Sequence, residues 1–289
     1  MEILAKRIDM STVKWISVVL LLGGGTSVML AGPVFSSGSY TAGFTFTDAL
    51  GPGGTTMAVA YDGVSYWSAS GGSPDGTRYA QYSGAGAVVG TYAPGLDFRS
   101  VFTDASGNVY AREYASSIYL QTSPGVFISD LDLSGGSLDA QSAVVRNPAL
   151  GEYDAMSSGT VSRWDLSGNY LGAVTLAGFG GAENTYPQSR GLAVASNYWL
   201  TYDGAGTLSA WSFGGARLDT TTLIGAGTSF DSDFSLSYAN GMVFIVDEAG
   251  GTWSGFDVGL NGSAVPEPSA FVLIGFGLLG IAGWRRVRG

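Results

Sequence analysis

The feature that most constrains the fold of this chain is an internal repeat in its middle. Five short turns, each containing Gly or Asn, precede runs of residues typical of β-strands. These runs begin at Val64, Val109, Glu152, Tyr198 and Met242, and are therefore 45, 43, 46 and 44 residues apart. Spacing this regular indicates that one small structural unit recurs five times.

Each unit contains further strand-like runs rich in Val, Tyr and Trp. A third strand follows a small-residue turn in every unit, at 78–83, 117–122, 160–166, 207–213 and 251–257. A fourth strand follows in four units, at 87–92, 126–131, 170–176 and 217–224. Four strands at a period near 44 residues are typical of a β-propeller blade. We expect an all-β, five-bladed propeller with no helix outside the termini. An elongated β-sandwich or solenoid is the alternative.

The fifth unit lacks a fourth strand of its own, because Gly259 and the C-terminal tail follow its third strand closely. The alternating segment 43–47 near the N-terminus can supply the missing strand. Closure by this strand joins the first and last blades noncovalently and removes open sheet edges.

Five tryptophans of the repeats are expected to pack between blades. Stacking of one or two exposed rings on carbohydrate is the alternative. These residues are Trp67, Trp164, Trp199, Trp211 and Trp253.

Composition excludes several kinds of chemistry. The chain has no Cys and no His, and residues 32–265 contain no Lys. Disulfides, thiolate metal sites, Ser-His-Asp and Cys-His hydrolases, histidine-ligated metals and Schiff-base enzymes are therefore ruled out. We expect no cofactor and no catalytic residue.

Charge argues against nucleic acid as a partner. Residues 32–265 hold 7 arginines and 20 acidic residues, a net charge of −13 that repels phosphate backbones. The acidic surface fits solubility outside the cell, with attraction of divalent cations as the alternative. The Asp-x-Asp pairs at 130–132 and 231–233 lack the Gly and bidentate Glu of a calcium loop, so no metal site is predicted.

Polar segments enter the innermost strand of four units, where ligands of propellers usually converge. We hypothesise that these segments form a binding site around one end of the central channel, here called the rim. Solvated turn residues are the plainer interpretation. The rim comprises Asp97, Arg99, Asp139, Gln141, Gln188, Arg190, Asp231 and Asp233.

One enzyme class survives the missing histidine. Glycoside hydrolysis needs only two carboxyl groups about 5–10 Å apart. The four glutamates of the body stand in no recognisable acid/base context, so a carboxylate-dependent glycosidase is the alternative and a non-enzymatic protein is the prediction. The four are Glu113, Glu152, Glu183 and Glu248.

The N-terminus is typical of a secretory signal peptide. Lys6, Arg7 and Lys14 precede an apolar run at 15–22, and small residues near Ala31 offer a cleavage point. The start could be Met1 or Met10 without changing this interpretation. We therefore divide the chain into a signal peptide at 1–31, a propeller at 32–264 and a tail at 265–289.

The tail joins a Pro-Glu-Pro segment to an apolar run at 270–284 and a terminal basic cluster. Fifteen residues are short against the roughly 20 that cross a bilayer, but the arginines and Trp284 match the flanks of a membrane helix. In this order the parts resemble the PEP-CTERM tail of exported bacterial proteins. The motif residues are Pro266, Glu267, Pro268, Arg285, Arg286 and Arg288.

The resemblance implies where in the cell the protein is located. Members of this family are exported by Gram-negative bacteria that make exopolysaccharide, and an exosortase-type membrane protease is thought to process them near Pro-Glu-Pro. On that analogy the partners are the export machinery, the exosortase and the inner membrane, with display at the cell surface or matrix after processing. We expect an exported, envelope-anchored, non-enzymatic protein that binds exopolysaccharide or surface proteins, as in biofilm.

Overall fold

The computed structural model describes residues 32–51, 55–247 and 251–261. The predicted signal peptide, its cleavage point at Ala31 and the predicted tail at 265–289 lie outside the described residues. No helix in the described ranges has the length and apolar character needed to cross a bilayer.

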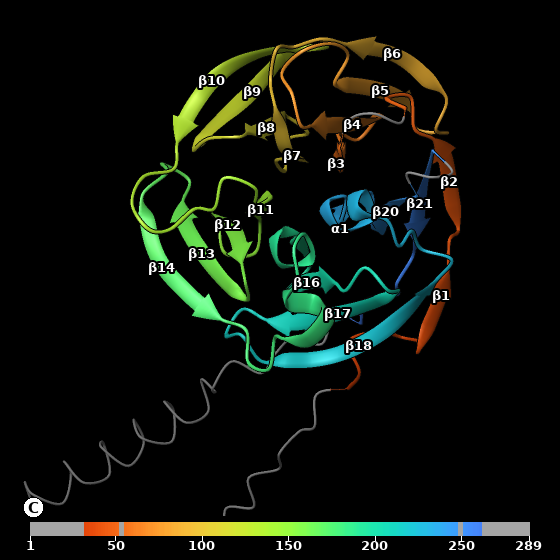
Figure 1. Cartoon of the computed structure of the whole chain (residues 1–289), viewed down its shortest axis with the longest axis vertical. Coiled ribbons are helices and arrows are strands. Elements are labelled where there is room, and N and C mark those ends of the chain that lie inside the picture. Colours follow the sequence, from red (N-terminus) through yellow and green to blue (C-terminus); the bar gives the residue numbers. More distant parts are fainter. Residues whose placement is uncertain (1–31, 52–54, 248–250, 262–289) are drawn as a thin grey trace, which may run out of the picture. The chain divides into compact units, whose positions relative to one another are not determined.

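The described residues form 21 strands in five sheets set around a central axis (Figure 1). Blade 1 contains β3 (Thr55–Tyr61), β4 (Ser65–Gly71), β5 (Tyr79–Ser83) and β6 (Val88–Tyr92). Blade 2 contains β7 (Phe98–Thr103), β8 (Val109–Glu113), β9 (Ser117–Ser123) and β10 (Val126–Asp132). Blade 3 contains β11 (Val144–Asn147), β12 (Glu152–Ser157), β13 (Thr160–Asp165) and β14 (Tyr170–Thr175).

The last two blades each include a strand from the N-terminal segment. Blade 4 contains β15 (Ala193–Ala195), β16 (Tyr198–Tyr202), β17 (Thr207–Ser212), β18 (Arg217–Ile224) and β1 (Ser39–Thr41). Blade 5 contains β19 (Ser237–Ala239), β20 (Met242–Asp247), β21 (Thr252–Phe256) and β2 (Phe44–Thr47). The predicted five-bladed propeller of four-stranded units is confirmed.

The N-terminal strand β2 closes the ring as expected. It pairs antiparallel with β21, placing Phe46 opposite Trp253. The Phe46 ring also lies 4.6 Å from the Tyr82 ring of blade 1, measured between centroids. Beyond β2, Asp48 accepts hydrogen bonds from Tyr82 (3.1 Å) and Thr56 (3.2 Å). Blade 5 is therefore completed and fixed to blade 1 by one short segment.

A second N-terminal strand was not expected. β1 pairs parallel with β18 at the outer edge of blade 4, with Ser39 opposite Thr222. Upstream of β1, buried Phe35 donates its backbone N–H to Asp219 and forms a bridge with Leu260. Residues 34–47 thus contact two blades, and three-residue β1 is too short for a period-2 pattern to reveal it.

The five tryptophans of the repeats lie in the core, as predicted. All five are at most 3% exposed, so none of them is available for carbohydrate stacking. Trp199 and Trp211 of blade 4 pack with Met156 and Val161 of blade 3. Trp164 of blade 3 packs in the same way with residues of blade 2.

The expectation that no helix occurs outside the termini was wrong for three short elements. These are η1 (Gly181–Asn184), η2 (Gln188–Arg190) and α1 (Phe230–Phe234). Ser229 and Ser232 form a capping box at the start of α1. All three lie in loops that lead to an innermost strand, and they are shorter than the window in which helical periodicity can be detected.

We expect Phe46→Ala to destabilise the protein by about 3–5 kcal/mol, because its ring is buried between blades 5 and 1. Thr45→Ala, at an exposed position of the same strand, is the matched control and should stay within about 0.5 kcal/mol. Urea unfolding followed by tryptophan fluorescence measures both. Equal effects would contradict closure through this side chain.

Candidate functional site

The innermost strands β3, β7, β11, β15 and β19 face the axis, so the loops that precede them meet at one end of the channel. Figure 1 shows α1 inside the ring of blades. The rim residues lie in these loops and at the starts of these strands, so the structure gathers them at one end as the repeat predicted.

Polar pairs connect blades 2, 3 and 4 at the rim. Arg99 donates to Gln141 (2.8 Å) and forms an ion pair with Asp97 (2.6 Å). Arg190 forms an ion pair with Asp139 (3.1 Å). These groups use much of their hydrogen-bonding capacity on one another. The rim is thereby ordered, and its role in binding stays a prediction.

A buried arginine that sequence reasoning missed supports this arrangement. The Arg112 guanidinium donates to the carbonyl oxygens of Ala115, Asp139, Ala140 and Ser142 at 2.7–3.2 Å. Burial lowers the pKa of Arg112 to about 10. Arg112 holds the loop that carries two rim residues. Its partners are backbone atoms, so no pairing of side-chain types marks it in the sequence.

Helix α1 places the two rim aspartates in different roles. Asp231 accepts the backbone N–H of Thr56 (2.9 Å), which connects α1 to blade 1. Asp233 is 3% exposed, and its Oδ1 has no hydrogen-bond partner among the described residues. Gly204, at φ +68°, lies so close to Asp233 and Gln188 that a side chain there would clash with both. Burial and the Asp203 carboxylate raise the pKa of Asp233 to about 7.

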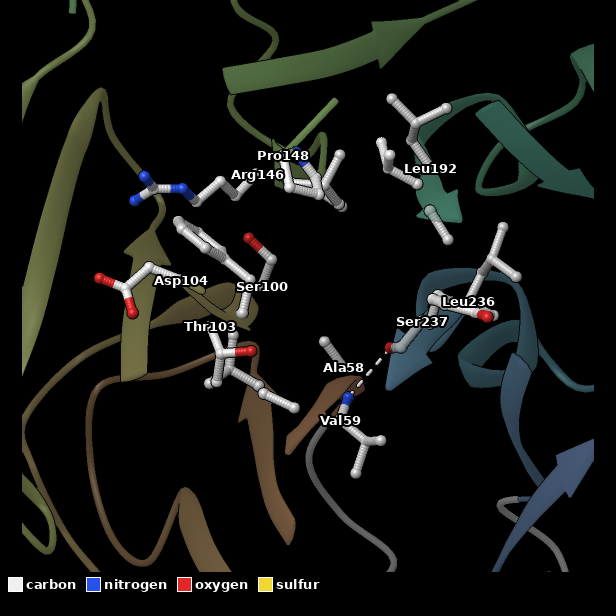
Figure 2. A pocket seen from close by; sticks show the side chains of 18 of the residues that line it. Ala58, Val59, Ser100, Thr103, Asp104, Arg146, Pro148, Leu192, Leu236 and Ser237 are labelled. Carbon is white, nitrogen blue, oxygen red and sulfur yellow. Dashed lines mark hydrogen bonds between the residues drawn. The ribbon is translucent and has the colours of Figure 1, made fainter. Parts of the chain in front are cut away.

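A cavity of about 240 Å³ lies on the axis, lined by residues of all five innermost strands and their flanking loops (Figure 2). Its walls are largely aliphatic, with Ala58, Val101, Leu192 and Leu236 among them. None of the rim residues lines it. The cavity is therefore distinct from the site that the sequence suggested.

Serine hydroxyl groups satisfy backbone groups of the inner strands. The Ser100 hydroxyl donates to the backbone carbonyl of Val144 (2.7 Å). It also accepts a hydrogen bond from the backbone N–H of Val144 (3.2 Å). The Ser237 hydroxyl accepts the N–H of Val59 (3.0 Å), as Figure 2 shows, and donates to Ser235. Because these hydroxyls are engaged between blades, the polar atoms of the wall are largely occupied.

The cavity reaches half-buried residues where the inner strands end. We call Thr103, Asp104, Arg146 and Tyr238 the mouth. The Asp104 carboxylate accepts hydrogen bonds from Ser106, Asn108 and, at 3.4 Å, Tyr110. Although burial raises its pKa, these bonds and the nearby Arg146 charge bring the net pKa of Asp104 below its ordinary value.

Sequence reasoning missed the mouth because its residues come from different blades. One local signal was present: Asp104 opens an Asp-x-Ser-Gly-Asn turn, which recurs at Asp165 with the same hydrogen bonds. That pattern predicts a turn and gives no indication of a cavity.

No group of three or more acidic side chains within the described ranges could hold a metal ion. Neither Asp-x-Asp pair, at 130–132 or 231–233, belongs to such a group.

The raised pKa of Asp233 predicts a pH effect. An unfolded aspartate titrates near 3.9, so the folded protein binds this proton more tightly. Asp233 therefore contributes its full stabilisation below about pH 4, and this stabilisation is lost as pH rises through about 7. The free energy of unfolding of Asp233→Asn, relative to wild type, should therefore rise between pH 4 and 7.

Asp165→Asn is the control for this titration. Hydrogen bonds from Asn169 and Ser167 lower the pKa of Asp165, so its titration lies below that pH range. Its unfolding free energy relative to wild type should be level from about pH 5 to 7, because this aspartate is ionised there in both the folded and the unfolded state. If the free energies of unfolding of Asp233→Asn and wild type change in parallel with pH, the raised pKa of Asp233 is contradicted.

Comparison with solved structures finds several chains similar to this one. Glutaminyl cyclase of Myxococcus xanthus is similar with a TM-score of 0.50 and 11% identity, covering 78% of this chain and 97% of that one. Virginiamycin B lyase of Staphylococcus aureus has a TM-score of 0.38 and 14% identity, covering 70% and 66%. BamB of Moraxella catarrhalis has a TM-score of 0.36 and 17% identity, covering 69% of this chain and 57% of that one. At 11% identity, the likeness to the glutaminyl cyclase shows the fold alone.

Sequence comparison identifies the tail. A search of curated proteins finds no relative of the chain. Residues 264–287 match the model of the PEP-CTERM protein-sorting motif, which confirms the resemblance seen in the tail. The chain therefore carries the sorting motif of exported, membrane-anchored proteins that exosortase sorts.

Proposed function

We propose that this protein is a non-catalytic binding module displayed at the cell envelope, and that its ligand occupies the axial cavity. The observation that carries the proposal is the cavity of about 240 Å³ lined from all five blades. Ligand sites are typically concave and mostly apolar, with a few polar groups that fix orientation. The aliphatic wall and polar mouth fit that description.

The composition of the cavity supports binding rather than catalysis. Asp104 is the one carboxyl group among its lining residues, and its oxygens are engaged in their own turn. The serine hydroxyls of the wall bond to backbone groups, and the Asp104 carboxylate forms no hydrogen bond with them that could activate them.

The sorting motif supports display outside the inner membrane. In the bacterial setting that PEP-CTERM tails imply, a matrix exopolysaccharide or a surface protein would supply the ligand. The volume is below the roughly 300–1,000 Å³ of pockets that enclose drug-sized molecules. A small molecule, or the end of a larger chain, is therefore the expected occupant.

The alternative function is a carboxylate-dependent enzyme at the rim. Asp233 favours it, because a carboxyl group with a pKa near 7 has the property of a general acid. Against it, the side chain is buried. The relative from Myxococcus xanthus is a glutaminyl cyclase, but its likeness concerns the fold alone.

We expect Thr103→Phe to block the mouth and to weaken ligand binding at least about tenfold, because a ring there occupies the space that the ligand needs. The full chain, purified in nonionic detergent, is screened against polysaccharides, peptides and small metabolites by thermal shift, with assay of released reducing sugar. Thr91→Phe, on an exposed outer strand, is the control and should bind as wild type does.

The screen separates the two functions. A ligand that Thr103→Phe excludes, with no reducing sugar released, supports the binding module. Sugar release that survives Thr103→Phe and disappears in Asp233→Asn would overturn it in favour of the enzyme. Binding equal in wild type and Thr103→Phe would place the ligand elsewhere.

A further inference from the structure

One arginine of the body differs from the other six. All seven lie in the described ranges, and six of them donate at least one hydrogen bond to a protein oxygen. The Arg146 side chain forms neither a hydrogen bond nor an ion pair within 4 Å among the described residues. It is also the arginine that lines the cavity.

The neighbouring carboxylate does not neutralise Arg146 by contact. Asp104 lies on the same side of the cavity in Figure 2, but no ion pair joins the two groups. The oxygens of Asp104 already accept bonds from its turn. Figure 2 shows the Arg146 side chain extending from the lining toward the outer side of the mouth, where its half-buried guanidinium, a planar fork of donors, is left without a protein acceptor in the described ranges.

We propose that Arg146 recognises a carboxylate, and that the ligand is a small monocarboxylate with a compact aliphatic body. This inference rests on the proposed function, because it assigns the ligand class of the same cavity. The carboxylate pairs with the Arg146 fork at the mouth, and the aliphatic body displaces water from the walls. A free acid and the C-terminus of a peptide carry the same chemistry.

Charge selects a singly charged ligand over a polyanion. A guanidinium binds a carboxylate through two parallel hydrogen bonds, which matches the donors of one arginine. The body around it carries a net charge of −13, which repels multiply charged ligands. Because the wall is largely aliphatic, it offers few hydrogen-bonding groups to a sugar ring, which favours a surface protein over an exopolysaccharide among the sources proposed above.

Hexanoate is the probe that tests this inference, with hexanamide as its uncharged match. Calorimetric titration uses the full chain in nonionic detergent, with an empty-micelle blank. Hexanoate should bind wild type more tightly than hexanamide does. Arg146→Gln should weaken hexanoate binding about 10- to 100-fold, the effect of losing a hydrogen bond to a charged group, and leave hexanamide unchanged.

Two control variants test whether the loss of hexanoate binding is specific to the guanidinium of Arg146. Arg78→Gln removes the same charge from a half-buried arginine outside the cavity and should bind hexanoate as wild type does. Arg146→Lys keeps the charge without the fork and should be intermediate. A leucine-ending peptide, free or amidated at its C-terminus, then distinguishes a chain end from a free acid as the source of the carboxylate.

Different results would contradict the carboxylate inference and the proposal that the cavity is the binding site. If hexanoate and hexanamide bind alike, or if Arg146→Gln binds hexanoate normally, the carboxylate inference is wrong. Exclusion of either ligand by Thr103→Phe would then still support the cavity as the binding site. If hexanoate does not bind at its highest soluble concentration, the inference is also overturned.

Discussion

The pairing of β2 with β21 is the interaction on which the rest of the structure depends. Each blade is a small sheet that cannot bury its faces alone, so it is stabilised by neighbours on both sides. The first and last blades are neighbours only if the chain returns to its start. Phe46 makes that return by packing on Trp253 of its own blade and Tyr82 of the next. Closure also creates the cavity, because five inner strands enclose an axis only in a complete ring.

The two ends of the channel use polar groups differently. At the rim, Arg99, Arg112 and Arg190 bond to carboxylates, an amide and carbonyl oxygens, and Asp233 Oδ1 is left without a partner among the described residues. At the mouth, Asp104 is satisfied by its own turn and Arg146 is left without a contact partner. Arg146 lines the cavity whereas no rim residue does, and this difference directs our functional proposals to the mouth.

The sequence predicted the blades well because their signals are local. Turn pairs, strand-length runs and a constant period identified the repeats, and the missing fourth strand of the fifth unit pointed to the segment 43–47. β1 and α1 were not predicted, since three or five residues carry too little periodicity. The rim residues precede or begin equivalent strands, and Arg99 with Gln141 and Arg190 with Asp139 form contacts between neighbouring blades, while the binding role of the rim stays a prediction.

The cavity could not be predicted for a different reason. Its wall is built from residues such as Ala58, Val101 and Leu236, which are indistinguishable in sequence from ordinary core residues. Arg146 carries no motif, and its lack of a partner is a property of the whole arrangement. Local patterns therefore identified the architecture and the sorting tail, whereas the site depends on contacts between blades.

Hydrogen exchange of the full chain would test the central claim, closure by the N-terminal strand, most directly. Alternate backbone amides of the edge strand β2 hydrogen-bond to β21, so these amides of 44–47 should exchange together with those of 252–256, at the slow rate of the blade cores. Fast exchange of 44–47, while 252–256 remains protected, would show that the ring stays folded without this strand and would contradict the account.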